Sequence, residues 1–501
     1  MIALPASPAH SCTRAGGDVP LATADLPGPD SLLRRTLGEW RIGLVAWRLL
    51  VLQTADPAVA AGMAHFSTYR AHPWRRIEHT MDSGKRLFFS DREGLRREIA
   101  RLERTHRRLA GTDEQGRQFT ALDPAVRVWV LVTLYECMTA MRELSGRPLA
   151  PPELDQMYGE FRAVCAEFGL SDDLLPATAA DVPAYMDRTI RKRLEYSEPV
   201  RYLLFDMLRE APAPRRLGHL KPAWPLVRTV AAHVIGALTI ADLPEAFRER
   251  FNLPRTRRAA LLSFILHRGM RVLMNALPEH RRYRTPLAGT SSTSEPSTAS
   301  TDRPSPPEAS PARLPAPRRR KGADSRPARL RTFFRQVLDQ TGDGRISSAD
   351  LQAMAHNVCW PLELTPEREA RVYAAFETWW QHLRTGMDAD DDGQVTCEEF
   401  VTAMLTGIDA GPGYLEQGLH VAVRAIFHAA DTDGSGHLCA DEYRTIFGGS
   451  RVHPAELNHG FRQLDHDGDG RITENEFVQA FTDYFTARTD NTAGSQLLGR
   501  P

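Results

Sequence analysis

One acidic pattern of 12 residues occurs four times in the C-terminal third of this 501-residue chain. In its second copy, Asp388, Asp390, Asp392 and Glu399 stand at positions 1, 3, 5 and 12, with Gly393 at position 6. Alternate oxygen-bearing side chains in a tight loop can surround a hard cation that takes six to eight oxygen ligands, and glycine allows the sharp bend. Apolar helical patterns flank each copy, so the repeat predicts four cation-binding helix–loop–helix units.

This pattern is the EF-hand calcium loop. The fourth copy keeps the acidic residues of the second, and the third replaces one carboxylate by a hydroxyl, which is still an oxygen ligand. We expect all three to bind calcium, with a backbone carbonyl at position 7. Their predicted ligands are Asp388, Asp390, Asp392, Gln394 and Glu399; Asp431, Asp433, Ser435, His437 and Glu442; and Asp465, Asp467, Asp469, Arg471 and Glu476.

The first loop departs most from the pattern. Its predicted ligands are Asp339, Thr341, Asp343, Arg345 and Asp350, so a hydroxyl stands at position 3 and the shorter Asp at position 12. Asp reaches less far than Glu and tends to bind through one oxygen, so this site is expected to be weak or to prefer magnesium. The module should therefore bind three to four calcium ions.

The loop starts are separated by 49, 43 and 34 residues. These spacings resemble those of the sarcoplasmic calcium-binding protein and calerythrin group. The resemblance implies one compact globule in which the first loop pairs with the second and the third with the fourth. The module has three methionines, Met354, Met387 and Met404, and lacks the Met-rich surface of calmodulin-type sensors. Buffer, structural and sensor roles all stay open.

Composition divides the chain into five predicted segments: a disordered N-terminus at 1–30, a helical domain at 31–287, a Pro/Ser-rich linker at 288–328, the EF-hand domain at 329–487 and a tail at 488–501. The linker carries a basic cluster at 318–321 that could touch anionic lipid or nucleic acid, but a solvated linker is the favoured interpretation. The rest of the sequence gives no support to nucleic-acid binding.

The net charge of zero hides two opposite halves. Residues 331–501 carry 27 acidic and 13 basic side chains, a net charge of −14, so residues 1–330 carry +14. Opposite charges attract within a Debye length of about 8 to 10 Å, so the acidic module could dock on the basic half of the same chain.

Six scattered cysteines, without a Cys-x-x-Cys pair, predict reduced thiols in a cytoplasm. The N-terminus shows no signal peptide. The most apolar segment, 226–240, contains Arg228 and His233 and is too short to span a bilayer, so we expect a buried helix and no transmembrane segment.

Between 31 and 287 the periodicity is mostly helical, without recurring strand alternation. One predicted helix starts at Asp91 and ends at Gly111, with apolar residues at spacings of three and four, such as Leu102 and Leu109. His106 lies on that apolar stripe, where its ring needs a partner if it is buried. From these residues alone, a hydrogen-bonded core histidine is favoured over a ligand.

Two blocks of this region add to that interpretation: GEWRIGLVAWRLLVLQTADPAVAAGMAHFSTYRAHPWRRIEHTMD and FFSDREGLRREIARLERTHRRLAGTDEQGRQFTALDPAVRVWV. From about Leu33 to Tyr283 the chain resembles the MpaB-like oxygenase family, which includes the latex-clearing rubber oxygenases. The resemblance implies an all-α domain that holds haem b, with His106 as axial ligand and Arg76 and Thr80 as an upstream pair. It also implies that dioxygen cleaves a carbon–carbon double bond of an isoprenoid or similar apolar substrate.

Two positions depart from that family. Asp56 precedes Pro57 where many relatives have His-Pro, and Glu103 stands where rubber oxygenases have an arginine three residues before the axial histidine. Two hypotheses follow: a calcium-binding, haem-dependent oxygenase, or a calcium-binding protein whose N-terminal domain is a non-catalytic scaffold. His65, His72 and His79 recur every seven residues, but Pro73 interrupts any shared helical face, so no metal site is expected there.

Overall fold

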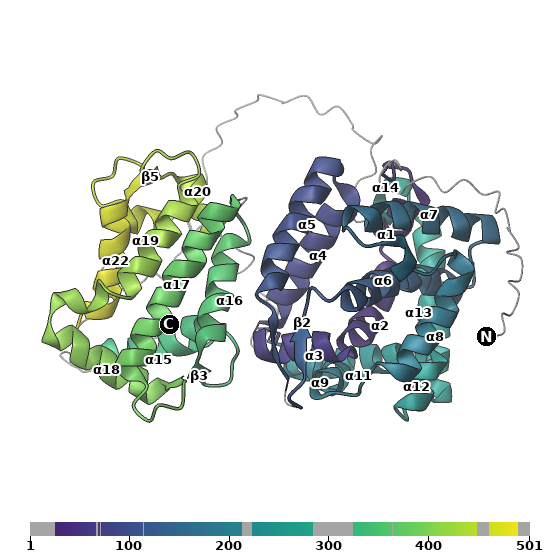
Figure 1. Cartoon of the computed structure of the whole chain (residues 1–501), viewed down its shortest axis with the longest axis horizontal. Coiled ribbons are helices and arrows are strands. Elements are labelled where there is room, and N and C mark those ends of the chain that lie inside the picture. Colours follow the sequence, from purple (N-terminus) through teal and green to yellow (C-terminus); the bar gives the residue numbers. More distant parts are fainter. Residues whose placement is uncertain are drawn as a thin grey trace, which may run out of the picture. The chain divides into compact units, whose positions relative to one another are not determined.

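The computed structural model describes residues 26–66, 69–70, 72–113, 115–212, 223–283, 324–362, 364–447 and 460–488. Most of this part is helical, and its sheets have two strands each, so the predicted all-α class is confirmed (Figure 1). The expected disordered N-terminus, linker and tail lie almost wholly outside the described residues. At the far end of that linker, helix α15 already begins at Arg326. The predicted domain boundaries therefore stay predictions.

Among the described residues before 284 there are fourteen helices, two short 3-10 helices and one hairpin. They are α1 (Leu32–Gly38), α2 (Ile42–Thr54), α3 (Pro57–Phe66), α4 (Pro73–Phe89), α5 (Arg92–Arg107), β1 (Ala110–Thr112), β2 (Gln118–Thr120), α6 (Pro124–Leu144), α7 (Pro151–Glu167), η2 (Asp172–Leu174), η3 (Ala179–Asp181), α8 (Val182–Lys192), α9 (Glu198–Phe205), α10 (Met207–Glu210), α11 (Trp224–Asp242), α12 (Glu245–Arg250), α13 (Arg257–Ala276) and α14 (Glu279–Arg282).

The described elements after residue 323 form the EF-hand module. They are α15 (Arg326–Phe333), the π-helix η5 (Phe334–Leu338), β3 (Arg345–Ile346), α16 (Ser348–Cys359), α17 (Pro366–Met387), β4 (Val395–Thr396), α18 (Cys397–Ala410), η6 (Pro412–Leu415), α19 (Leu419–Ala430), β5 (His437–Leu438), α20 (Ala440–Phe447), β6 (Ile472–Thr473) and α22 (Glu474–Thr486).

The chain divides into two compact units. The first unit comprises 1–59, 81–200 and 234–292, and the second comprises 60–80, 201–233 and 293–501. The second unit therefore combines the EF-hand module with the start of α4 and other short segments from the helical region.

In the first unit, α5 begins as predicted, because the Asp91 carboxylate accepts the Gly94 N–H at 2.8 Å and caps the helix. The predicted end at Gly111 is wrong by four residues. The helix ends at Arg107 because the chain turns into a hairpin, in which Gly111 pairs with Phe119 across β1 and β2.

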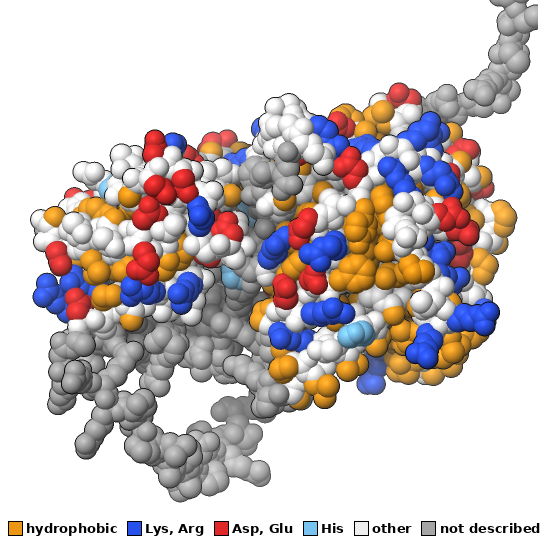
Figure 2. All heavy atoms as spheres, turned by 90° about the horizontal axis from the view of Figure 1, so that it is seen from below, with side chains coloured by type: hydrophobic (Ala, Val, Ile, Leu, Met, Phe, Trp, Pro, Cys, Tyr) orange, Lys and Arg blue, Asp and Glu red, His pale blue; other side chains and the backbone are white. Residues whose placement is uncertain are grey.

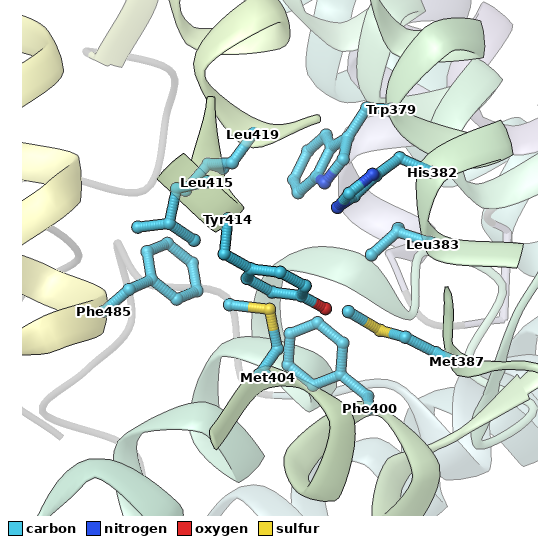
Figure 3. Close-up of a pocket in the computed structure, with 10 residues that line it drawn as sticks. All are labelled: Trp379, His382, Leu383, Met387, Phe400, Met404, Tyr414, Leu415, Leu419 and Phe485. Atoms are coloured by element: carbon cyan, nitrogen blue, oxygen red, sulfur yellow. The ribbon is translucent and has the colours of Figure 1, made fainter. Parts of the chain in front are cut away.

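In the EF-hand module, β3 pairs with β4 and β5 pairs with β6, so the predicted pairing of the loops is confirmed. Each pair joins the apolar residues at loop position 8, Ile346 with Val395 and Leu438 with Ile472, and all four are fully buried. One continuous core extends over the whole module, which confirms the expected single globule. The core leaves a cavity of about 10 Å³ lined by ten side chains, including Trp379, His382 and Tyr414 (Figure 3). That volume is about enough for one water molecule.

Helix α11 was expected to be buried, and for its first half this is wrong. Leu226 is 71% and Val230 55% exposed, whereas Leu238 near the other end is buried. Apolar side chains are also visible on the molecular surface next to Lys and Arg (Figure 2). By length and composition, α11 is the one helix among the described residues that could cross a membrane; α2 with the first part of α3 qualifies only as a pair bent by 96°. The five described cysteines are free, as predicted.

Candidate calcium and cofactor sites

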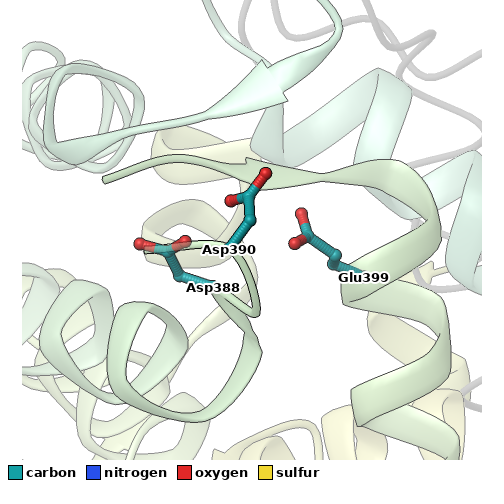
Figure 4. A group of neighbouring side chains, drawn as sticks. All are labelled: Asp388, Asp390 and Glu399. Atoms are coloured by element: carbon teal, nitrogen blue, oxygen red, sulfur yellow. The ribbon is translucent and has the colours of Figure 1, made fainter. Parts of the chain in front are cut away.

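The second loop gathers three predicted ligands at one point. Asp388 follows the end of α17, Gly393 makes the turn with a φ of +78°, and Glu399 lies in the first turn of α18. One carboxylate oxygen from each of Asp388, Asp390 and Glu399 lies within 4.8 Å of the others (Figure 4). Hydrogen bonds from the Thr396 hydroxyl and N–H hold the pKa of Glu399 below its usual value, so the group is ionised and ready for a cation.

The third and fourth loops repeat this geometry. Their gathered acids are Asp431, Asp433 and Glu442, and Asp465, Asp467 and Glu476. These are the acids at positions 1, 3 and 12. At position 5 of the second loop, Asp392 instead pairs with the Arg345 side chain of the first loop at 2.6 Å. An incoming ion must therefore compete with Arg345 for that carboxylate.

The first loop adopts the same fold with fewer gathered acids. Asp350 is fully buried, and its oxygens accept the N–H groups of Gln340 and Thr341, each at 2.9 Å, and the N–H of Ser347 at 2.8 Å. Burial raises the pKa of Asp339 and of Asp350. The position-12 Glu residues of the other three loops accept the N–H of position 2 in the same way, so the first loop differs by its shorter position-12 side chain and by the full burial of Asp350.

The predicted cofactor residues lie on α4 and α5. His106 is half-buried in the last turn of α5, and Leu102 one turn earlier is half-buried too. Thr80 is exposed and belongs to the second unit, whereas His106 belongs to the first. Arg76 lies in α4, but its side chain is outside the described part. The grouping of these three residues stays a prediction.

A buried ionic cluster fixes α5 in the first unit. Glu98 is 3% exposed and accepts the Ser83 hydroxyl of α4 at 2.6 Å and Arg101 Nε at 2.9 Å. Glu103 lies 3.3 Å from Arg127 of α6. Glu103, which replaces the arginine of the rubber oxygenases, is therefore paired with a residue of another helix. These contacts fix the orientation of α5, the helix that carries His106.

These surroundings fit a haem in chemical type. His106 offers an imidazole at the end of an apolar stripe, and the half-buried Leu102 and Leu109 leave apolar surface that a flat cofactor could cover. Arg104 and Arg107 lie in the same last turn of α5, and their guanidinium groups could pair with the carboxylate groups of a haem.

A second cavity, of about 290 Å³, lies where α3 begins. Asp56, the other departure from the family, is fully buried beside it and lies 2.7 Å from Arg193 Nε. Burial raises the pKa of Asp56 although Arg193 opposes the shift. Asp113 and Arg117 also line this cavity, so its wall is charged and suits small polar molecules better than haem.

A buried polar network that the sequence analysis missed joins four helices of the first unit. Arg48 of α2 makes two hydrogen bonds of 2.5 Å to Glu136 of α6, and its Nε donates to the Asp242 carbonyl at 2.7 Å. Asp242 is the last residue of α11. Its carboxylate accepts a hydrogen bond from the Ser263 hydroxyl of α13 at 2.5 Å and lies 2.8 Å from His267 Nε2. Arg48 and Glu136 are lone charges within apolar runs, which is the signal that could have found them.

Within the second unit, the start of α4 contacts the first EF-hand. Arg75 donates to the Gln340 side chain at 2.9 Å, and Gln340 is position 2 of the first loop. The His79 ring stacks on Trp360, with 4.1 Å between centroids. His79 thus has an aromatic partner, and α3 ends before Pro73 begins α4.

Comparison with known proteins finds similar sequences for both the helical region and the EF-hand module. Residues 34–276 match the family model described as "ER-bound oxygenase mpaB/B'/Rubber oxygenase, catalytic domain", and 421–482 match an EF-hand domain pair. Calcium-binding protein LPS1-beta of Lytechinus pictus is 27% identical over 153 residues, which are 30% of this chain and 53% of that protein. Calerythrin of Saccharopolyspora erythraea is 23% identical over 155 residues, which are 30% of this chain and 88% of that protein. The chain thus spans about half of the first relative.

Solved structures with similar chains are also of calcium-binding proteins. A Streptomyces coelicolor calcium-binding protein is 30% identical, with a TM-score of 0.29, over 32% of this chain and 96% of that one. The amphioxus sarcoplasmic calcium-binding protein is 18% identical, with a TM-score of 0.30, over 36% of this chain and 98% of that one.

Fold and loops together define an EF-hand calcium-binding protein with an additional all-helical domain. Nearly all of that helical domain matches the MpaB/rubber oxygenase catalytic family model, and the C-terminal module is similar to sarcoplasmic calcium-binding protein and calerythrin. Both resemblances stated from the sequence are confirmed.

Proposed function

We propose that this protein is a cytoplasmic haem-dependent oxygenase with its own calcium-binding module. The observation that carries the proposal is His106, a half-buried imidazole on a fixed helix of an oxygenase-family domain. Haem at this site would supply dioxygen activation and the oxidative cleavage of a double bond in an apolar, isoprenoid-like substrate.

The residues of the chain have defined tasks in this proposal. His106 would hold the haem, and the apolar side chains next to it would keep water from the cofactor. The Glu98 cluster positions α5 through Ser83 and Arg101. Arg76 and Thr80, four residues apart on α4, orient the cofactor surroundings by analogy with the family.

The test is the visible spectrum of the full chain expressed with a haem supply. We expect a Soret band with about one haem per chain by pyridine haemochrome, since one axial histidine serves one haem. His106→Ala should lose it, while His233→Ala, which replaces an exposed histidine of α11, should keep it. Full haem in His106→Ala would remove the central claim.

The scaffold alternative keeps one observation in its favour. Asp56 occupies the family's His-Pro position as a buried partner of Arg193, which is a structural role. A folded, calcium-binding chain without haem would favour this alternative.

Calcium regulation is the second part of the proposal. The Arg75–Gln340 and His79–Trp360 contacts support it, because they join the first EF-hand to the helix that carries Arg76 and Thr80. Turnover with calcium and with chelator would be compared on the same haem-loaded protein. Equal rates would leave the EF-hands as buffering or stabilising elements.

A further inference from the structure

The outward side of α13 carries large apolar side chains in solvent. Leu261 is 59%, Phe264 53%, Ile265 55%, Val272 62% and Leu273 53% exposed. They follow one another at spacings of three, one, seven and one residues, which places them on one side of the helix. We call this set, together with the exposed Arg257, Arg258 and Arg268, the α13 outer face.

The opposite side of α13 is anchored in the first unit. Ser263 and His267 are buried and both bond to the Asp242 carboxylate. Arg271 donates to the Gly146 carbonyl at 3.1 Å. The outer face is therefore exposed on a helix whose orientation is fixed by buried polar bonds.

The charge of the helix selects the kind of partner. α13 contains no Asp or Glu, and within the described ranges no carboxylate pairs with Arg257, Arg258 or Arg268. Arg268 lies over the Phe264 ring at 4.6 Å, so cation and apolar surface occur side by side. Apolar side chains bordered by unpaired arginines fit an anionic lipid surface.

A second copy of the chain fits this face less well. A two-fold contact would place the arginines of one outer face against those of the other, and such like charges repel. A membrane span does not fit either, because α13 is not among the helices apolar enough to cross a bilayer. The helix suits a position in the plane of the membrane surface.

We propose that the α13 outer face binds the surface of an anionic lipid bilayer, with its apolar side chains at the acyl boundary and its arginines at lipid phosphates. This inference is independent of haem and of catalysis. It gives the helical domain a place where apolar molecules are concentrated.

The test is flotation of the full chain with vesicles, in chelator so that calcium cannot bridge protein to lipid. We expect binding to phosphatidylcholine vesicles that contain phosphatidylglycerol and much weaker binding to phosphatidylcholine alone. The variant Leu261→Ser/Phe264→Ser/Ile265→Ser should bind at least tenfold less. Leu174→Ser/Tyr196→Ser, which changes two apolar side chains 38% exposed elsewhere in the first unit, should bind like the parent.

A charge variant tests the second half of the proposal. Arg257→Gln/Arg258→Gln should weaken binding to the anionic vesicles by roughly tenfold, since each basic residue near such a surface contributes a few-fold. Its matched control, Arg97→Gln on the exposed side of α5, should have little effect.

Three results would overturn the proposal. One is no binding to anionic vesicles; another is binding unchanged in the triple variant, which would assign it to the basic linker. The third is a dimer by light scattering that the triple variant converts to a monomer without any change in flotation. If circular dichroism shows the triple variant misfolded, Val272→Ser/Leu273→Ser removes the next turn of the face and decides the question in the same way.

Discussion

At the scale of single residues, position 12 of the first loop decides how many ions the module holds. Asp350→Glu should raise calcium affinity at that loop by about tenfold, because the longer side chain can bind through both oxygens. Glu already accepts the N–H of position 2 at the same place in the third and fourth loops, so the longer side chain fits this hydrogen-bond pattern. Isothermal titration calorimetry should show a fourth site of high affinity.

The reverse substitution in the second loop is the control. Glu399→Asp should lower affinity there by a similar factor and leave the other loops unchanged. An unaltered titration for Asp350→Glu would mean that Thr341 at position 3, and not the length of residue 350, limits the first site.

Asp56 provides a pH-dependent prediction. Burial raises its pKa in the folded protein, so its ionisation costs stability once the pH exceeds the unfolded pKa of about 3.9. This contribution to stability should therefore grow as the pH falls, and Asp56→Asn should remove that part of the pH dependence, although it also removes the ion pair with Arg193. Urea denaturation at pH 7 and pH 5 measures it. Asp173→Asn, an exposed change in the same unit, should leave the pH dependence of the parent unchanged.

At the scale of elements, a glycine inside α18 is required by its neighbour. A Cβ at Gly407 would overlap the Tyr414 ring of η6, which lines the small core cavity. Gly407→Ala should destabilise the calcium-free module by about 1–3 kcal/mol, although alanine usually favours a helix. Gly386→Ala in α17, where nothing lies within 4 Å, should be neutral or stabilising by about 0.5 kcal/mol. A stabilising Gly407→Ala in urea denaturation would show that Tyr414 moves freely.

Local sequence rules predicted some elements and not others. The cap at Asp91 and the glycine turns of the loops depend on a few adjacent residues, so they were predictable. The end of α5 depends on the hairpin that follows, in which Gly111 pairs with Phe119 eight residues further on. The spacing of apolar residues in the helix does not show such a pairing. The exposure of Leu226 also depends on what packs nearby, which an apolar run cannot show.

The same distinction holds for the sites. Twelve-residue spacing predicted the three acids that come together in each of the second, third and fourth loops, since each loop closes on itself. The network of Arg48, Glu136 and Asp242 is assembled from distant helices, so only a lone charge in each apolar run could hint at it.

At the scale of the whole molecule, charge separates the two halves of the chain. Residues 331–501 carry −14 and residues 1–330 carry +14. Four bound calcium ions would add eight positive charges and leave the module at −6. Calcium therefore weakens any attraction between the halves, and this weakening should be smaller at high salt.

The contact of Arg75 with the first loop allows a test of regulation that needs no substrate. Arg75 donates to the side chain of Gln340 and so places a positive charge beside position 2 of the loop, where it opposes the entry of a cation. Since coupling between sites is reciprocal, Arg75→Ala should raise calcium affinity at the first loop by about fivefold. Calorimetry of the full chain measures it. Arg335→Ala is the control. It removes an exposed positive charge just before the loop, so it measures the effect of losing a nearby charge without losing the contact with Gln340. Equal affinities in Arg75→Ala and the parent would show that α4 does not sense the first loop, and calcium regulation would then need another route.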